Sequence, residues 1–403
     1  MVKTLSLLTA ALLLVALAVP ALAGDAANVD VTGQVRWRSI IDDTDFNSDT
    51  DATHFTEMRS RIGVGLHPQE NMDLFFQLQD SRIIGSDAGT DPMGFSNTVN
   101  MHQAYLVYHP CDKGAITAGR FEMNMHNQRL VGAVGWSNIG RTFEGVRFDR
   151  SFDSFMLNLF ATQLTESSYL KGDSSTDRYF AGANAHFDSA DFDLFVYYDD
   201  DSSNNDMYRF TVGAYSQRDV NETFGYESMF AFQFGSYDDT DTDIAAWMFY
   251  GDLVFKTDAG FMFHAIADLT SGTKADDDKV KTFDNLYYTG HKFRGAMDYF
   301  VGQPVEGLMD LAARVGYKFN ERWCTNGTFH YFANMQDRWT SKTLTGGANG
   351  EKAIGTEVDL ALTYKDAGNF SWTNGFSFFT LSDDFMPNAD TSTWFYSMAT
   401  MNF

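Results

Sequence analysis

Arginine is unevenly distributed in this sequence, and its spacing predicts a wall of positive charge. Ten of the 17 arginines precede residue 151. Arg36 and Arg38 are two residues apart, as are Arg59 and Arg61, so each pair would point to one side of an extended strand. Guanidinium groups match carboxylates with forked donors, and rings of arginine or lysine make pores that prefer anions. The candidate selectivity residues are Arg36, Arg38, Arg59, Arg61, Arg120, Arg129, Arg141, Arg147 and Arg314.

A second interpretation gives the same arginines a structural role. Acidic residues such as Glu57 and Asp149 are available to pair with them, and such pairs would hold the wall rigid. The two interpretations are compatible, and the sequence leaves both open.

The elements that position these arginines are predicted to be strands, because apolar and polar residues alternate with period two. The alternation is clear in "VTGQVRWRS" (31–39), "MRSRIGVGL" (58–66), "MDLFFQLQ" (72–79) and "LAARVGYKF" (311–319). A soluble β-sandwich would show the same period. Strands of about ten residues, separated by short turns and longer acidic loops, are typical of outer-membrane barrels. Aromatic residues near strand ends, as at Trp37, also favour a barrel, because such rings suit the membrane–water boundary.

Eighteen strand candidates follow, an even number as in bacterial single-chain barrels. Short turns such as "PQEN" and "KDAGN" then all fall at one end, and long loops such as "DDTDFNSDTDATH" and "SDAGTDPMGFSNTV" at the other. The predicted fold class is therefore all-β: a transmembrane antiparallel β-barrel of about 18 strands, with short periplasmic turns and longer extracellular loops. The strands are predicted to begin near Val29, Phe55, Met72, Asn100, Ala115, Arg141, Phe155, Arg178, Asp191, Met207, Phe224, Ile244, Phe261, Leu308, Thr325, Ala353, Phe370 and Trp394.

The first 23 residues are predicted to be a secretory signal peptide. Lys3 supplies a positive charge, an apolar stretch covers 5–19, and "ALA" at 21–23 fits a cleavage site. A membrane-anchoring helix is the alternative, but the apolar stretch is shorter than the ~20 residues that a span needs. Residues 24–403 are predicted to form a single barrel domain in the outer membrane of a Gram-negative-type bacterium.

The chain ends on an aromatic residue, Phe403. Phe403, Met401, Ala399 and Phe395 share one face of the last predicted strand, and we expect this face to contact lipid. A terminal phenylalanine on such a strand resembles the assembly signal of outer-membrane proteins. The barrel-assembly machinery is therefore a predicted partner, and Phe403 is the predicted signal.

The charge balance is strongly acidic and argues against nucleic acid as a partner. The formal net charge is −25, and without Lys3 it becomes 28 − 54 = −26. The acids gather in predicted loops, for example between Asp42 and Asp51 and from Asp238 to Asp243. They would either bridge to lipopolysaccharide through divalent cations or form a solvated surface. Outer-membrane lipid and lipopolysaccharide are predicted partners.

Nothing in the sequence predicts a cofactor, a metal site or catalysis. Cys111 and Cys324 are too few for a disulfide scaffold, and we expect them on opposite sides of the barrel and unpaired. No haem-attachment or zinc-type spacing of cysteine and histidine occurs. Ser137 is not part of a G-x-S-x-G turn, and no serine or cysteine accompanies a histidine in a nucleophile–base pattern.

The longest predicted loop contains the segment "FDNLYYTGHKFRGAMDYF" (283–300). A loop of about 35 residues is usually functional or disordered, and this one is too aromatic for disorder. We expect it to fold inward and to narrow or gate the pore; a folded cap over the rim is the alternative. The predicted constriction residues are Phe283, Asp284, His291, Lys292, Phe293 and Asp298.

Two segments resemble the alginate-export family of outer-membrane barrels. One is the loop segment 283–300. The other is "AGRFEMNMHNQRLVGAVGWSNIGRTFEGVRF" (118–148), which is similar to the family's G-R-x-E, R-L-x-G, W and G-R-x-F-x-G-x-R pattern. The family often has aspartate before the last glycine of that pattern, where this chain has Glu144. The matching residues are Gly119, Arg120, Glu122, Arg129, Leu130, Gly132, Trp136, Gly140, Arg141, Phe143, Gly145 and Arg147.

The resemblance implies an 18-stranded passive channel, which in the family's best-known member releases an anionic uronate polysaccharide. With the arginines it predicts a porin-like channel that lets anionic or neutral saccharide-like solutes diffuse through an arginine-lined lumen. The alternatives are a structural or adhesive barrel with a plugged pore and an outer-membrane hydrolase. The solute, the direction of transport and the oligomeric state are not determined by the sequence.

Overall fold

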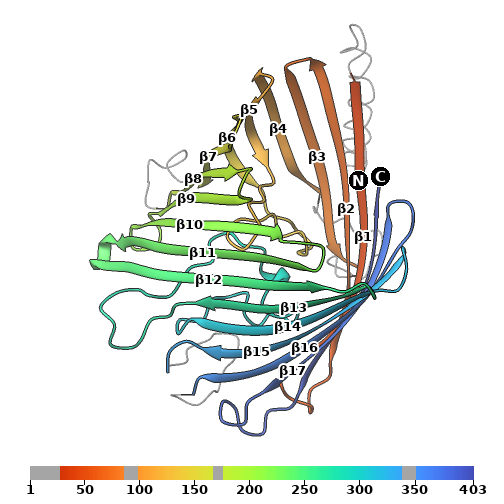
Figure 1. Cartoon of the computed structure of the whole chain (residues 1–403), viewed down its shortest axis with the longest axis vertical. Helices are drawn as coiled ribbons and strands as arrows, with labels where there is room; N and C mark the ends of the chain where they lie inside the picture. Colours follow the sequence, from red (N-terminus) through yellow and green to blue (C-terminus); the bar gives the residue numbers. More distant parts are fainter. Residues whose placement is uncertain (1–27, 86–98, 167–175, 338–350) are drawn as a thin grey trace.

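The computed structural model of the chain describes residues 28–85, 99–166, 176–337 and 351–403, and its strands form one sheet that closes on itself (Figure 1). The predicted signal peptide and most of the predicted loop "SDAGTDPMGFSNTV" lie outside these residues. No helix in these ranges is long and apolar enough to span a bilayer.

The strands are β1 Asn28–Asp43, β2 Thr53–Gln69, β3 Met72–Ile83, β4 Val99–Cys111, β5 Gly114–Phe121, β6 Phe143–Ser151, β7 Met156–Thr165, β8 Arg178–Phe187, β9 Phe192–Asp201, β10 Met207–Asp219, β11 Phe224–Tyr237, β12 Thr242–Lys256, β13 Phe261–Thr270, β14 Leu308–Lys318, β15 Trp323–Asn334, β16 Ala353–Lys365, β17 Phe370–Leu381 and β18 Ser392–Asn402. Two short 3₁₀ helices, η1 Asp238–Thr240 and η2 Gly290–Lys292, lie in connections.

Each strand pairs antiparallel with its neighbours in chain order, and β18 returns to β1. The closing register runs from Gln34↔Asn402 to Asp43↔Thr393. A closed sheet leaves no edge strand, so no strand presents a whole row of unpaired backbone amides. The predicted all-β, 18-stranded antiparallel barrel is confirmed. Predicted strand starts differ from the observed ones by two residues at most, as at β2 (Phe55 against Thr53) and β6 (Arg141 against Phe143).

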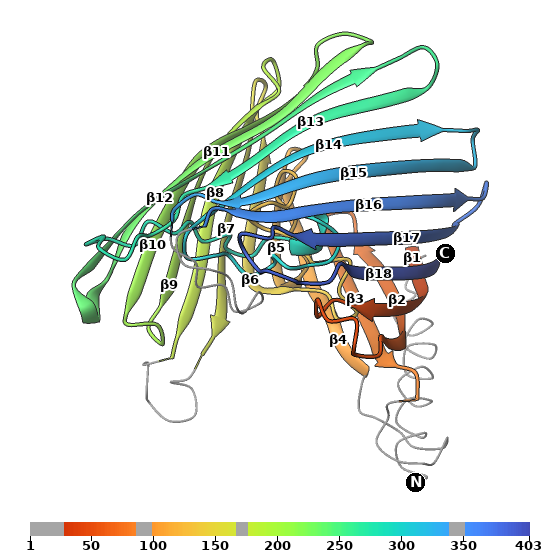
Figure 2. The ribbon, with the colours of Figure 1, turned by 90° about the horizontal axis from the view of Figure 1, so that it is seen from below.

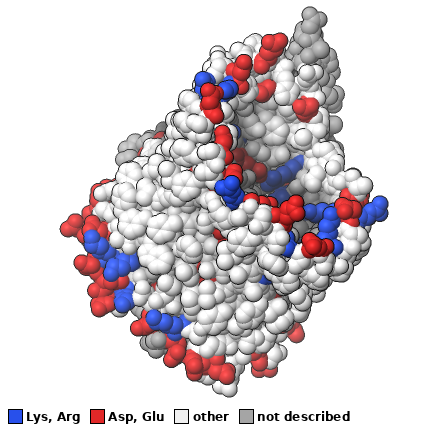
Figure 3. Space-filling model, in the orientation of Figure 1, with Lys and Arg blue, Asp and Glu red and all other residues white. Residues whose placement is uncertain are grey.

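The two faces of the wall differ as the alternation predicted. In β1, Val31 is 59% exposed on the outside, whereas Arg36 and Arg38 are only 3% and 2% exposed on the inside. In Figure 3 the outer surface is mostly uncharged, and charged residues gather along its margins and in a hollow. This is the arrangement of a barrel with lipid outside and a polar lumen.

The connections are sorted between the two ends of the barrel. At one end, here called the short-turn end, β2 is joined to β3 through 70–71 and β4 to β5 through 112–113. At the other, the long-loop end, 122–142 connect β5 to β6 and 271–307 connect β13 to β14. The C-terminus lies at the short-turn end, beside β1 (Figure 2).

The two longest described connections turn into the barrel and pair there. They are called the first inner segment (122–142) and the second inner segment (271–307), and the second appears in turquoise within the barrel outline in Figures 1 and 2. Val131 and Tyr287 form a parallel bridge. The Gly132 N–H donates to Tyr287 O at 2.8 Å, and the Tyr287 N–H donates to Leu130 O at 2.8 Å.

Two apolar clusters anchor the inner segments to opposite parts of the wall. Met123, Leu130 and Val131 pack with Phe283 against inward aromatic residues of β7–β12. Met297 and Phe300 pack against inward residues of β1 and β14–β18. Full burial of such a side chain contributes about 1.5–3 kcal/mol. The inner segments are therefore fixed parts of the fold.

The C-terminal Phe403 takes part in closing the barrel. Its N–H donates to Gly33 O at 3.0 Å, and the Gly33 N–H donates to Phe403 O at 2.8 Å. A Cβ at Gly33 would collide with the Phe403 ring, so the ring covers that position of β1. The predicted face of the last strand is confirmed by the exposure of Met401 (54%) and Phe403 (56%). The assembly-signal role stays a prediction.

We expect deletion of Phe403 to lower the yield of folded barrel several-fold, because both closing hydrogen bonds and the ring are lost. Phe403→Ala and Gly33→Leu should have similar, smaller effects, since each removes the ring from Gly33. The folded fraction is measured by heat-modifiable migration in gel electrophoresis. Met401→Ala, on the same face, is the control. A wild-type yield after deletion would contradict the closing role.

Candidate functional site

Arg36 and Arg59 hold the first inner segment against the wall. The Arg36 guanidinium donates to Gly135 O and Trp136 O at 2.9 Å each and to Ser137 O at 3.1 Å. Arg59 donates to Gly135 O at 3.0 Å and to Ser137 O at 2.8 Å. The turn therefore aims its carbonyls at two guanidiniums. Hydrogen bonds to charged groups contribute about 1.5–3 kcal/mol each.

Arg38 and Trp136 join this turn to the second inner segment. The Arg38 Nε donates to Glu57 Oε2 at 2.9 Å, and its guanidinium carbon lies 3.9 Å from the Trp136 ring centroid. The His291 ring stacks on Trp136 with centroids 3.8 Å apart and planes at 11°. Both faces of the indole are thus covered. His291 Nδ1 also lies 2.9 Å from Asp298 Oδ1, within its own segment.

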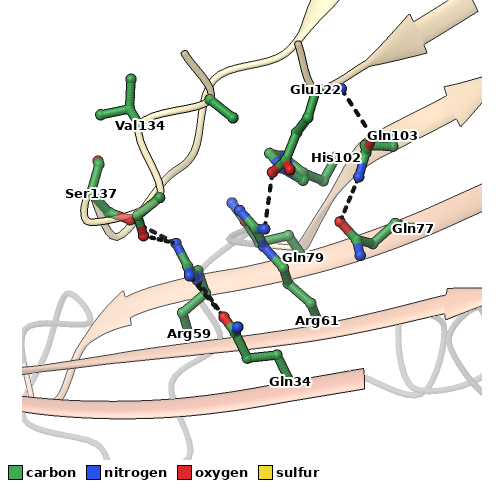
Figure 4. A network of polar contacts seen from close by, with 12 residues as sticks. Gln34, Arg59, Arg61, Gln77, Gln79, His102, Gln103, Glu122, Val134 and Ser137 are labelled. Carbon is green, nitrogen blue, oxygen red and sulfur yellow. Dashed lines mark hydrogen bonds and ion pairs between the residues drawn. The ribbon is translucent and has the colours of Figure 1, made fainter. Parts of the chain in front are cut away.

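Arg61 meets the start of the first inner segment (Figure 4). It donates to Glu122 Oε1 at 3.0 Å and to Gln79 Oε1 at 2.6 Å. His102 Nε2 lies 2.7 Å from the same Glu122 oxygen, and Gln103 accepts the Glu122 N–H at 2.9 Å. Glu122 is therefore held through its Oε1 and its backbone N–H where β5 leaves the wall.

A buried carboxylate in β13, Asp268, links the two inner segments. It is 1% exposed and pairs with Arg129 of the first segment and, at 2.8 Å, with Arg294 Nε of the second. The Arg129 guanidinium lies between the rings of Tyr250 and Phe293, at 3.8 and 3.9 Å. Pairing with Asp268 raises the pKa of Arg294 against the effect of its burial. The charged group formed by Arg129, Asp268 and Arg294 is structural, because its charges are buried and paired with one another inside the protein.

The second inner segment also binds the wall at β16, three strands from the strand of Asp268. The Met297 N–H donates to Glu357 Oε1 at 2.9 Å, and the Ala296 N–H donates to Asp359 Oδ2 at 3.3 Å. Gly295 has φ +83°, and a Cβ there would collide with the Glu357 carboxyl group. Glycine is therefore required for this close approach.

Three cavities that share His291 adjoin the paired inner segments. The largest, of about 610 Å³, is lined on the wall side by β10–β18 residues such as Arg314 and Thr363. A second, of about 590 Å³, lies toward the long-loop end beside Asp42 and Phe55. The third, of about 420 Å³, lies beside Arg36 and Arg59. His291 lines all three cavities, so it lies where they adjoin.

The remaining predicted lumen arginines lie in different places. Arg147 is on the inner face and pairs with Asp149 at 2.7 Å. Arg314 lines the largest cavity and donates to Thr328 Oγ1 at 3.2 Å. Arg141 lies at the end of the first inner segment and donates to Tyr288 O at 3.0 Å. Burial lowers the pKa of Arg141, and the nearby Tyr287 and Tyr288 oppose that shift.

The prediction that Arg120 lines the lumen is wrong. Arg120 is opposite Glu144 in the β5–β6 register and pairs with it at 2.5 Å. Glu144 shares its face of β6 with Val146, which is 48% exposed. Phe121, the next residue after Arg120, is the one that points inward, with 2% exposure. Arg120 therefore points outward.

The predicted constriction residues are brought together inside the barrel. Phe283 is fully buried, and Asp284 pairs with Arg209 of β10 at 3.0 Å. Lys292 Nζ donates to Asn127 O of the first segment at 2.9 Å. Phe293 contacts Arg129, and Asp298 contacts His291, as described above. The segment thus folds inward and is not a cap over the rim.

The chain matches the alginate-export family over residues 27–399. The chain belongs to the alginate-export family. No curated protein matches the sequence significantly.

Solved structures share the fold of this alginate-export barrel at low sequence identity. OccK11 (OpdR) of Pseudomonas aeruginosa has 12% identity and a TM-score of 0.61, and the match covers 93% of this chain and 95% of that one. A BenF-like porin of Pseudomonas fluorescens has 11% identity and a TM-score of 0.64, with 93% and 98% covered. With the family, they identify an outer-membrane, porin-like β-barrel channel.

Several residues of this alginate-export barrel that shape the lumen were not predicted. They include the acidic residues Asp268, Glu357 and Asp359 and most of the first inner segment. The sequence offered one signal that residues 122–142 are not a solvent-exposed loop. They contain a single acid, Glu122, whereas the predicted exposed loops of this chain are rich in acidic residues. A long, glycine-containing connection with so few charges is better suited to the barrel interior than to water.

The residues that could have formed a disulfide, a metal site or a nucleophile–base pair are not arranged for this chemistry within the described ranges. Cys111 and Cys324 are both free. Within the described ranges, no group of three or more His, Cys, Asp or Glu is arranged to hold a metal ion. The Ser137 Oγ accepts the Ile139 N–H at 3.2 Å, so it stabilises the turn that Arg36 and Arg59 bind.

We expect the Arg36→Met/Arg59→Met double variant to give a larger and noisier single-channel conductance. The carbonyls of the 135–137 turn would lose their charged donors, at about 1.5–3 kcal/mol for each bond. Planar-bilayer recording is the measurement. Arg147→Met is a matched control, because it removes an inner-face charge that pairs only with Asp149 of its own strand. Changed ion selectivity without added noise would show that the arginines act as free charges.

His126 should make the first inner segment sensitive to acid. Burial and the nearby His186 lower the pKa of His126 to about 4, below its usual value of 6.5. The folded state therefore binds the proton less well, so stability is complete above pH 6.5 and falls as the pH drops toward 4. The loss is on the order of 3 kcal/mol.

The measurement is hydrogen-exchange protection of residues 122–142 at pH 7.5 and pH 5. His126→Phe keeps a ring between Phe195 and Tyr215, each 5.0 Å from the imidazole, but cannot titrate. Its protection should fall less than that of the wild type. Equal falls in the two proteins would exclude His126 as the cause.

Proposed function

We propose that this barrel is a channel for passive diffusion of anionic or neutral saccharide-like solutes across the outer membrane. The observation that carries the proposal is a closed wall with three adjoining cavities around two inner segments that pair inside it, in a chain of the alginate-export family. Passage requires no bond to be made or broken.

The arginine cluster supports a preference for anions through its field. Arg36, Arg38, Arg59 and Arg61 face two acids, Glu57 and Glu122, which leaves a local excess of 4 − 2 = 2 positive charges. Most of their donors are used by the first inner segment or by the wall side chains Glu57, Gln34 and Gln79, so direct binding of a solute is not their main role. A positive region inside low-dielectric walls still raises the local concentration of anions.

The largest cavity supports passage of polyhydroxylated solutes. Thr328, Thr363, Thr373 and Ser377 bring hydroxyl groups to its lining, and Tyr215 and Tyr250 add aromatic rings with hydroxyls. Hydroxyl and amide groups exchange hydrogen bonds with a saccharide without holding it firmly. The plugged-barrel alternative is supported by the pairing of the inner segments across the lumen.

The test is the reversal potential of the purified barrel in a planar bilayer under a potassium chloride gradient. Anion preference is expected, and Arg36, Arg38, Arg59 and Arg61 replacements should weaken it. Cation preference would mean that the acidic loops control access to the pore.

A silent wild-type barrel would favour the plugged alternative, and deletion of 283–300 then decides. The ends of this deletion are near each other, since Thr282 Oγ1 donates to Val305 O at 2.5 Å. The deletion should raise conductance if the second inner segment narrows the pore. Unchanged conductance would exclude that role.

A further inference from the structure

Two carboxyl groups of β16 bind the same turn of the second inner segment. Glu357 Oε1 accepts the Met297 N–H at 2.9 Å, and Asp359 Oδ2 accepts the Ala296 N–H at 3.3 Å. Glu357 and Asp359 are two residues apart on the inner face of the strand, whereas Leu360 is 49% exposed on the outer face. Since their donors belong to consecutive residues, the two carboxyl groups lie side by side.

Each of these carboxyl groups also has a buried oxygen that accepts no hydrogen bond from the described residues. The two atoms are Glu357 Oε2 and Asp359 Oδ1. Glu357 is 0% exposed, and a Cβ at Gly295 would collide with its Oε2, so the turn covers this oxygen. Buried polar atoms normally have a partner. A proton held between the two oxygens would give each atom one, because a protonated carboxyl group is a donor.

The basic group that contacts the pair is already engaged with another acid. His330 of β15 is opposite Glu357 in the register, and its Nε2 lies 3.6 Å from Asp359 Oδ2. Its Nδ1 lies 2.9 Å from Asp310 Oδ1 of β14. In this part of the described wall, a single imidazole therefore faces three carboxyl groups.

The other titratable groups around the pair are bound elsewhere or are neutral. Arg294 of the second inner segment forms the buried ion pair with β13 described above. Arg314 of β14 lies near His330 and donates to Thr328 Oγ1 at 3.2 Å. Tyr396 of β18 faces Asp359, and Tyr299 of the second inner segment faces Glu357. Burial raises the pKa of the Tyr299 hydroxyl, so this ring carries no charge.

We propose that Glu357 and Asp359 form a proton-binding site that fastens the second inner segment to the wall. Two adjoining carboxyl groups without a cation share one proton, because two negative charges so close repel each other strongly. Glu357 is the protonated partner, since it is fully buried and only Asp359 contacts His330. Its Oε2–H donates to Asp359 Oδ1, and its Oε1 still accepts the Met297 N–H.

The site makes the attachment of the second inner segment depend on pH. Loss of the shared proton leaves two adjoining negative charges, whose repulsion moves the 295–297 turn away from β16. An exposed carboxyl group is ionised above about pH 5. Stability falls with rising pH wherever the folded state holds a proton that the unfolded chain has released. The attachment is therefore complete at neutral pH and weakens at alkaline pH, whatever solute the barrel carries.

The direct test is infrared spectroscopy of the detergent-solubilised full chain in D₂O at pH 7.5, because protonated and ionised carboxyl groups absorb separately. The wild type minus Glu357→Gln difference should contain one protonated carboxyl group. Asp359→Asn should instead remove an ionised one. Glu321→Gln is the matched control, since this side chain is 92% exposed in a turn and should also remove an ionised group. An ionised group in the Glu357→Gln difference would overturn the proton-binding site.

Hydrogen exchange of the Ala296 and Met297 amides, followed by NMR, tests the pH-dependent attachment. Their protection factors, which are corrected for the intrinsic effect of pH on exchange, should fall several-fold between pH 7 and pH 9.5 in the wild type. Glu357→Gln keeps the acceptor and a donor but has no proton to lose, so its factors should change little. The Tyr287 amide, bound to Leu130 O, is the internal reference. Equal falls in the two proteins would overturn the pH-dependent attachment.

Discussion

The whole structure depends on the requirement that every backbone polar group in a membrane find a partner inside the protein. The wall meets it by closing β18 onto β1, so that no strand edge remains. The interior must meet it too, because the inner segments bring irregular backbone into the lumen. At 135–137 the partners are guanidiniums. Arg36 and Arg59 donate hydrogen bonds to backbone carbonyls of this turn, which lies away from the strands.

This requirement changes what an arginine-rich lumen means. In β1 and β2 the guanidiniums hold the first inner segment against the wall, and under the proposed function their excess charge would act on a solute as a field. Direct contact with a solute would require a cation whose donors are not all used by the fold. The number of arginines in a lumen is therefore a poor guide to where a solute binds. Their existing partners have to be examined first.

The strands could be predicted from the sequence because their signal is local. Period-two alternation placed Arg36 and Arg38 inside and Val31 outside, and even strand parity sorted the turns from the loops. Arg120 was misplaced because "AITAGRF" lacks clear alternation, so this stretch gives no phase that would place the side chain inside or outside the barrel. The first inner segment gives no periodic signal, since its position depends on residues such as Tyr287 that are distant in sequence.

The pairing of the inner segments also has a kinetic consequence. Val131 and Tyr287 are 287 − 131 = 156 residues apart, and contacts of such separation form slowly because a long chain must first be ordered. We expect the strands between Val131 and Tyr287 to join the wall before the two inner segments pair with each other inside the barrel. A newly inserted barrel would then leak more than a mature one, and a lower permeability of the cell long after insertion than shortly after it would reveal this step. Between insertion and pairing of the inner segments, each new copy would be a wider open pore in the outer membrane, and the cell has to tolerate this interval.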